Sequence, residues 1–392
     1  MVSDINNTPK ALRLHIGVFG TTNAGKSTLI NTISGQDIAL TSPVAGTTTD
    51  PVFKPMELLP LGPVVFIDTA GLDDNTELGA LRMQKSMEQL KACDAVLYVL
   101  SSVAEDIEAQ LAHIETISKK NIPMLIVINR FGDGTLDLDK RYNTISVNLS
   151  DKKEAETLKK AVISLLENKE EEPVLTANLV KSGDVVMLVA PQDIQAPKGR
   201  LILPEVQTLR DLLDNGCIAM TTTAGNIEKA LASLNKLPDL VITDSQIFGA
   251  VNAILPKTVP LTSFSMLMAK IKGDINSFIN GAKAIDELKD GDRVAILESC
   301  AHHALPDDIA RIKLPKLLGK YTGKKLEIDI ISGQSITADI KKYKIAIHCG
   351  GCMVNRRAML AKQAMFEDMG VPMTNFGIAI AYMNGILERV CF

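Results

Sequence analysis

The chain has 392 residues, 46% of them apolar and 22% charged, and a formal net charge of -4. This length predicts two or three domains, and the composition is typical of a soluble globular protein. The weak negative charge would not attract nucleic acid or anionic lipid, and a chain with no tryptophan and 4% aromatic residues has few side chains for base stacking. We therefore expect no nucleic-acid partner and no membrane association.

The first ten residues lack the apolar core of a signal peptide, and the longest apolar runs, such as 95–100 and 124–128, are far shorter than the ~20 residues that span a bilayer. These features predict a cytoplasmic protein. Because thiols stay reduced in the cytoplasm, the six cysteines are better interpreted as metal or redox groups than as disulfides.

Runs rich in valine and isoleucine alternate with amphipathic stretches between residues 12 and 168. The predicted strands are 15–20, 64–68, 95–100, 124–129 and 143–147. The predicted helices are 26–33, 77–91, 105–119 and 152–167. This alternation predicts an α/β fold with a doubly wound sheet that binds ligands at the carboxyl ends of its strands. The charged run 167–173, which ends in proline, predicts the first linker.

A second alternation follows that linker and contains no charged cluster that looks catalytic, so we interpret it as a scaffold or self-association module. Its predicted strands and helices are 185–190, 206–213, 217–222, 225–234, 240–243 and 245–255. A weaker boundary at 255–261 precedes a third α/β segment, with predicted elements at 275–289, 293–297, 326–330, 343–347 and 355–369. We expect domains at 1–172, 173–260 and 261–392.

The segment from Gly20 to Ser27 matches the P-loop pattern G-x-x-x-x-G-K-S, and it follows a predicted strand and precedes a predicted helix. Its backbone N–H groups can surround phosphate oxygens, Lys26 can neutralise the β- and γ-phosphates, and Ser27 can bind Mg2+. The residues expected to bind nucleotide here are Gly20, Asn23, Ala24, Gly25, Lys26, Ser27 and Thr28.

Two further segments complete the expected phosphate site. Asp68-Thr-Ala-Gly71 follows a buried strand, where Asp68 can hold the Mg2+ water shell and the Gly71 N–H can contact a γ-phosphate. Upstream, Thr47 and Thr48 lie in a loop suited to the first switch, and Thr48 is expected to contact Mg2+. The catalytic residues would then be Lys26, Thr48, Asp68 and Gly71. Residues 10–170 resemble a GTPase of the translation-factor-like class, in which γ-phosphate orders both loops.

The guanine-reading segment departs from the usual Asn-Lys-x-Asp. Asn129 is correctly placed after its strand, but Arg130 replaces the lysine and the carboxylate of Asp133 comes one residue late. Ser146 would provide the last contact to the base. These residues predict GTP as the nucleotide, with guanine selectivity depending on the shifted carboxylate.

Leu72 stands where Ras-like proteins place a glutamine that orients water, and leucine cannot do this. Asn23 and the threonine-rich loop resemble the potassium-dependent GTPases of tRNA modification, in which this asparagine helps to hold a monovalent cation. The resemblance implies potassium-stimulated hydrolysis, with Asn23 as the K+ ligand. Without an arginine finger, turnover of about 10⁻⁴ to 10⁻² s⁻¹ is expected.

The last quarter of the chain carries Cys300-Ala-His302 and His348-Cys349-Gly-Gly-Cys352. Three thiols and two imidazoles indicate a metal site, and a glycine-rich turn suits an iron–sulfur cluster approached by backbone N–H groups. The spacing alone leaves tetrahedral zinc and a redox dithiol open as alternatives. The other three cysteines, Cys93, Cys217 and Cys391, are interpreted as buried or incidental.

A P-loop GTPase with Asn23, a middle segment without catalytic features, and Cys-x-His followed by His-Cys-x-x-Cys together resemble the FeFe-hydrogenase H-cluster maturation GTPase family (HydF). The resemblance covers the whole chain and the order of its three parts. It implies a homodimeric scaffold with an α/β dimerisation domain and an α/β domain that binds a 4Fe-4S cluster.

In that resemblance Cys300, Cys349 and Cys352 hold the cluster, and His302 or His348 fills or tunes the fourth iron position. A transient two-iron subcluster precursor, made with radical-SAM maturases, would be loaded there and passed to apo FeFe-hydrogenase. Two other functions stay open: a redox-sensing regulatory GTPase with a cluster, and an RNA-modification GTPase with a structural zinc.

Overall fold

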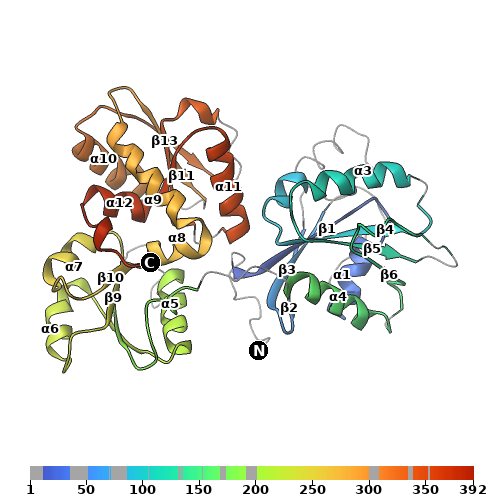
Figure 1. Ribbon diagram of the computed structural model, residues 1–392, viewed down its shortest axis with the longest axis horizontal. Helices are drawn as coiled ribbons and strands as arrows, with labels where there is room; N and C mark the ends of the chain where they lie inside the picture. Colours follow the sequence, from blue (N-terminus) through green and yellow to red (C-terminus); the bar gives the residue numbers. More distant parts are fainter. Residues whose placement is uncertain are drawn as a thin grey trace. The chain divides into compact units, whose positions relative to one another are not determined.

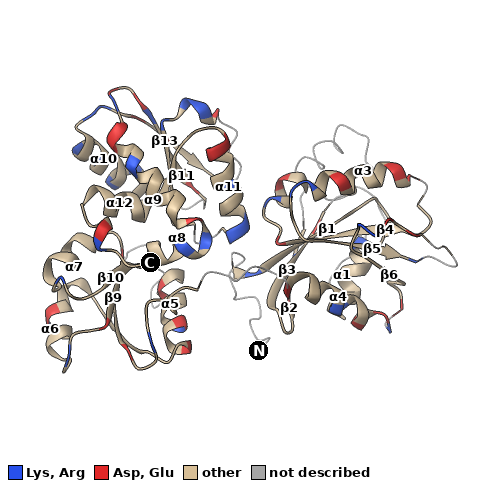
Figure 2. Ribbon diagram, viewed as in Figure 1, with Lys and Arg blue, Asp and Glu red and all other residues tan. Residues whose placement is uncertain are grey.

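The computed structural model describes residues 12–35, 52–69, 71, 86–104, 106–130, 134, 136–151, 153–167, 174–190, 201–299, 309–333, 339–351 and 354–392. The chain divides into two compact units, Met1–Glu171 and Glu172–Phe392 (Figure 1). Within the described ranges, no helix has both the length and the apolar content needed to cross a membrane. Charges of both signs are interspersed over the helices of each unit (Figure 2).

A mixed sheet with the strand order β2-β3-β1-β4-β5-β6 forms the first unit. Its strands are β1 (Leu14–Gly20), β2 (Val52–Leu58), β3 (Gly62–Asp68), β4 (Ala95–Ser101), β5 (Met124–Asn129) and β6 (Thr144–Val147). Neighbours are parallel except β2, which runs antiparallel to β3. The five predicted strands are confirmed. β2 was not predicted, because its buried face carries the charged residue Lys54 and because it contains Pro55, which is uncommon within sheets.

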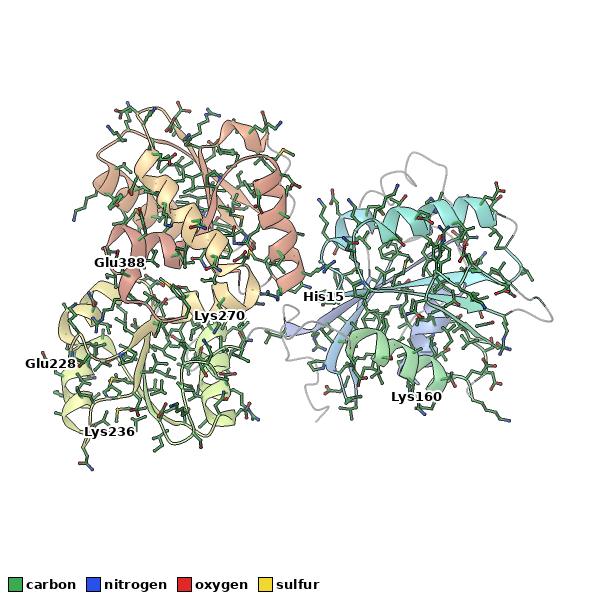
Figure 3. All side chains as sticks on the ribbon, in the orientation of Figure 1. His15, Lys160, Glu228, Lys236, Lys270 and Glu388 are labelled. Atoms are coloured by element: carbon green, nitrogen blue, oxygen red, sulfur yellow. The ribbon has the colours of Figure 1, made fainter. Side chains whose placement is uncertain are left out.

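Three described helices cover the two faces of this sheet: α1 (Lys26–Ser34), α3 (Ile107–Ser118) and α4 (Ala155–Glu167). α1 and α4 bury their apolar residues in one core cluster, and α3 buries Ile114 and Ile117 in another. The sheet is therefore wound on both faces, as predicted. The helix predicted at 77–91 lies mostly outside the described residues. His15 on β1 (labelled in Figure 3) is buried, and its Nδ1 donates to the Arg13 carbonyl at 2.9 Å, which suits a structural role.

Two parallel four-stranded sheets form the second unit, with orders β10-β9-β7-β8 and β12-β11-β13-β14. The first contains β7 (Val185–Val189), β8 (Ile218–Thr222), β9 (Leu240–Thr243) and β10 (Leu261–Ser263). The second contains β11 (Arg293–Glu298), β12 (Glu327–Ser332), β13 (Ile345–His348) and β14 (Met373–Asn375). The domain boundary expected after residue 260 lies just before β10, the strand that completes the first of these sheets.

Eight α-helices are described in this unit: α5 (Leu203–Asp214), α6 (Ile227–Ala232), α7 (Phe248–Ile254), α8 (Phe264–Lys272), α9 (Ile275–Lys283), α10 (Leu314–Thr322), α11 (Arg356–Asp368) and α12 (Phe376–Met383). Short 3₁₀ segments occur at Ala224–Asn226, Ala284–Glu287, Ile340–Lys342 and Leu387–Arg389, and a π segment at Ile309–Lys313. One apolar cluster contains Val241 and Ala295, which lie on different sheets, together with Met266 of α8. This shared core explains why the two sheets form a single compact unit.

Candidate functional sites

The P-loop connects β1 to α1, and its backbone is shaped to surround a phosphate. Asn23 and Gly25 both have positive φ, 62° and 106°, and Gly25 is the N-cap of α1. The Lys26 ammonium arches back over the loop and donates to the carbonyls of Gly20 at 3.0 Å and Thr21 at 2.7 Å. The helix N-terminus and the ammonium thus place positive charge on the same loop, an arrangement that suits a phosphate chain.

Asp68 ends β3 beside the start of α1. The Ser27 hydroxyl donates to Asp68 Oδ2 at 3.3 Å, so the two groups expected to serve Mg2+ lie together. The Lys54 ammonium, which comes from β2, lies 3.1 Å from the same oxygen. Hydroxyl and carboxylate oxygens are ligands that Mg2+ accepts, so this donor set fits the ion.

Asn129 joins the P-loop to the loop after β6. Its Nδ2 donates to the Ala24 carbonyl at 3.0 Å, and its Oδ1 accepts from the Leu149 N–H at 3.3 Å. Arg130 forms a salt bridge with Glu154, whose other oxygen accepts from the Asn148 N–H at 3.1 Å. Arg130 therefore supports the loop after β6 through Glu154.

The remaining predicted nucleotide contacts are described only in part. Thr28 lies on α1, Ser146 lies on β6, and Gly71 follows β3. Thr47, Thr48 and Asp133 lie outside the described residues, so their roles stay predictions.

Gly25 provides a test of this geometry. A Cβ at Gly25 would lie 2.5 Å from Asn129 Nδ2, and φ there is 106°. We expect Gly25→Ala to weaken GDP binding at least about tenfold and to lower the free energy of unfolding by about 1–3 kcal/mol. The matched control is Gly35→Ala at the other end of α1, where φ is 66° but a Cβ would meet nothing within 4 Å. This control should lose about 1–2 kcal/mol of stability and retain GDP affinity. Equal affinity losses in both variants would contradict the role of the close approach to Asn129.

The second candidate site lies where β11 and β13 end. These strands are parallel neighbours, with Leu297 opposite His348. The Cys349 N–H donates to the Leu297 carbonyl at 2.8 Å, and the Ser299 N–H points to Cys349 Sγ at 3.4 Å. Cys300 is the next residue in the chain. The fold therefore places Ser299, the residue before Cys300, beside Cys349.

His348 is fully buried at the end of β13. Its Nδ1 lies 2.7 Å from the Cys349 carbonyl, so Nδ1 carries the proton, and Nε2 accepts from Ser299 Oγ at 2.9 Å and from Lys362 Nζ at 3.2 Å. Burial, and after it the charge of Lys362, lowers the pKa of His348 to about 3, so the ring is neutral at pH 7. In this geometry both ring nitrogens have protein partners, which suits a residue that tunes or holds the turn. That His348 is an iron ligand stays a prediction.

The residues that begin α11, and Val354 just before them, are tied to α8. Lys272 Nζ donates to the Val354 carbonyl at 2.7 Å. Arg356 Nη1 donates to three carbonyls at the end of α8: Lys270 (3.3 Å), Ile271 (3.0 Å) and Gly273 (3.2 Å). Basic residues accordingly mark the end of α8 and the start of α11 (Figure 2). Cys349 is thus tied to β11, while Val354 and Arg356 are tied to α8.

The donor chemistry of this turn fits a thiolate-bound metal group. A backbone N–H directed at a cysteine sulfur is typical of metal-bound thiolates. Gly351 has a φ of 64°, and a Cβ there would lie 2.5 Å from Met359 Cε, so the turn requires glycine at this position. Within the described ranges, no three His, Cys, Asp or Glu side chains form a metal-binding group. Cys300, His302 and Cys352 lie outside those ranges, so the full ligand set stays a prediction.

Lys54 and Lys362 are buried lysines beside these sites that no sequence motif identifies. Lys54 occupies an inward position of β2, in register with buried Met56 and Leu58. Lys362 is 9% exposed and lies on the buried stripe of α11 with Met359 and Phe366. In both cases the available signal is a lysine at a position where the period of the element predicts an apolar residue.

Family models match the chain on either side of the boundary between its two compact units, Met1–Glu171 and Glu172–Phe392. Residues 175–273 match the model described as "Hydrogen maturase F dimerization domain", and residues 276–391 match "Hydrogen maturase F tetramerization domain". Residues 15–130 match "50S ribosome-binding GTPase". The segment expected to bind a cluster thus matches a domain named for the formation of a tetramer, which the sequence did not predict.

Curated relatives match about a third of this chain. The chain is 32% identical over 137 residues to GTPase Der of Campylobacter hominis, covering 34% of this chain and 29% of that protein. It is also 32% identical over 120 residues to the tRNA modification GTPase MnmE of Histophilus somni, covering 30% and 26%. The chain therefore spans less than a third of the length of these relatives.

Among solved structures, Aquifex aeolicus Era bound to GDP.AlF4- is 19% identical, with a TM-score of 0.32, over 53% of this chain and 92% of that chain. The two hydrogen maturase F models follow one another without overlap through the second unit, behind a matched GTPase domain. The chain therefore belongs to the hydrogen maturase F (HydF) family.

Proposed function

We propose that this chain is a slow GTPase that serves as a scaffold and carrier in the maturation of FeFe-hydrogenase. It binds GTP and Mg2+ in its first unit. It holds a 4Fe-4S cluster in its second unit, through Cys300, Cys349 and Cys352. It self-associates as a homodimer in the cytoplasm, receives a two-iron subcluster precursor with the help of radical-SAM maturases, and delivers it to apo FeFe-hydrogenase.

The nucleotide part of the proposal is supported by the P-loop geometry. Lys26 and the N-terminus of α1 would hold the phosphates, and Ser27 and Asp68 would hold Mg2+ and its waters. Asn129 would contact the base while it keeps the P-loop and the loop after β6 in place. A site of this kind changes state with its nucleotide, and slow hydrolysis suits a regulatory step.

The observation that carries the metal part is the adjacency of β11 and β13, which places Cys349 beside the residue that precedes Cys300. Three thiolates leave one corner of a 4Fe-4S cluster without a cysteine, and that corner would supply a replaceable coordination position for a second iron unit. His348 and Ser299 would keep the turn in position without closing this corner.

Metal analysis of protein purified under strict exclusion of oxygen tests the proposal. We expect about four iron and four sulfide per chain, and activation of apo-hydrogenase once the precursor is loaded. One tightly bound zinc per chain would instead support a structural zinc site in a GTPase of another function. A cluster that responds to oxidants but never activates apo-hydrogenase would support a redox sensor.

Potassium stimulation tests the proposed role of Asn23. Asn23 has a φ of 62°, in the left-handed region, which asparagine tolerates better than most residues. We expect GTP turnover to be faster in KCl than in NaCl at equal ionic strength. Asn23→Gly, which keeps the backbone conformation and removes the amide, should still bind GTP through Lys26 and the loop N–H groups and should lose this difference. Equal turnover of the unaltered protein in both salts would contradict the proposal.

A further inference from the structure

Lys54 places a buried ammonium at the expected magnesium site. Its Nζ lies 3.1 Å from Asp68 Oδ2, and the same oxygen accepts from Ser27 Oγ at 3.3 Å. The side chains of Lys54 and Asp68 are only 9% and 13% exposed. Water therefore screens this ion pair weakly.

The register of the sheet explains how Lys54 reaches Asp68. β2 runs antiparallel to β3, with Val52 opposite Asp68 and Lys54 opposite Phe66. Because side chains alternate along a strand, Lys54 and Asp68 lie on the same face as diagonal neighbours. A buried ammonium requires an anionic partner, and Asp68 is that partner here.

From this geometry we propose that Lys54 is a protein-borne counter-ion that competes with Mg2+ for Asp68. It thereby sets the Mg2+ concentration at which nucleotide is held tightly. The ammonium and the hydrated Mg2+ draw on one carboxylate oxygen and repel each other at this distance. Part of the favourable free energy of Mg2+ binding is therefore used to displace Lys54 from Asp68 or to share the Asp68 carboxylate with it.

Lys54 also stabilises the site when Mg2+ leaves. Without a cation nearby, the Asp68 carboxylate would be buried beside phosphate oxygens and would repel them. The ammonium offsets that charge, so loss of Mg2+ and exchange of nucleotide need not pass through an uncompensated buried anion. Lys54 acts here as a positioning residue through Asp68 and need not contact the nucleotide.

The test is the affinity for a fluorescent GDP analogue, measured over a range of free Mg2+ concentrations. For Lys54→Met we expect the Mg2+ concentration that gives the half-maximal gain in affinity to fall on the order of tenfold. Lys54→Gln keeps a hydrogen-bond donor for Asp68 but no charge, and its Mg2+ midpoint should also fall. This variant tests the competition if Lys54→Met does not fold. Lys54→Arg should resemble the unaltered protein.

Lys119→Met is the matched control, since it removes one positive charge from an exposed position at the end of α3. It should leave the Mg2+ midpoint unchanged. An unchanged or higher midpoint in the folded, uncharged Lys54 variants would overturn the competition. The proposal rests on the nucleotide site proposed above, and the two fail differently. An unaltered protein that binds no GDP at any Mg2+ concentration refutes the site itself.

Discussion

Replacement of Cys349 by alanine is expected to remove the bound iron while GTP hydrolysis stays within about twofold of the unaltered protein, because independent sites change each other little. Of the three cysteines expected to hold the cluster, Cys349 is the one whose surroundings the structure describes: its sulfur accepts from the Ser299 N–H, and its carbonyl accepts from His348 Nδ1. Loss of one of three thiolates leaves a cluster with two thiolate ligands, which is too few to hold it. Iron and sulfide content and the visible absorption of anaerobically purified protein measure the loss.

Cys391→Ala is the control for this experiment. Cys391 lies in the same compact unit, but its sulfur donates to the Leu261 carbonyl, on the other sheet, at 3.5 Å. Burial raises the pKa of the Cys391 thiol, which makes it a poor metal ligand. The control should therefore keep its full iron content. Iron retained in Cys349→Ala would refute the ligand assignment, and simultaneous loss of iron and hydrolysis would refute the independence of the two sites.

The nucleotide half of the site could be predicted from the sequence because its parts are local. A glycine-rich loop between a strand and a helix specifies its own backbone, so the contacts of Lys26 follow from a segment of eight residues. Lys54 could not be predicted in the same way. It meets Asp68 only through the antiparallel pairing of β2 with β3, and the sequence did not identify β2 as a strand.

The metal half shows the same limit over a longer range. The cysteine spacing predicts a metal site, but it does not reveal that β11 and β13 are parallel neighbours that bring Ser299 to Cys349. Nor does it show that His348 has Lys362 and the Cys349 carbonyl as partners. These contacts depend on which strands pair, and strand pairing is set by the packing of the whole unit rather than by any local pattern.

Lys26→Ala is expected to weaken GTP binding about 100-fold or more, since removal of one member of a charge pair costs about 3 kcal/mol or more. The Lys26 ammonium already lies over the P-loop, held by the Gly20 and Thr21 carbonyls, so it meets a bound phosphate chain with little reorganisation. Nucleotide affinity by calorimetry, and the rise in melting temperature on adding GTP, measure the loss. That rise should nearly vanish, because stabilisation by a ligand depends on its affinity.

Lys160→Ala is the matched control, since Lys160 is an exposed residue of α4 in the same unit (labelled in Figure 3) and its removal changes the net charge equally. It should bind GTP normally. Lys26→Ala should also keep its iron, because Cys349 and its partners belong to the other compact unit. If it does, and if it also fails to activate apo-hydrogenase, nucleotide is needed after the cluster is in place. Full activation by this variant would instead separate GTP from delivery and leave the carrier role to the second unit alone.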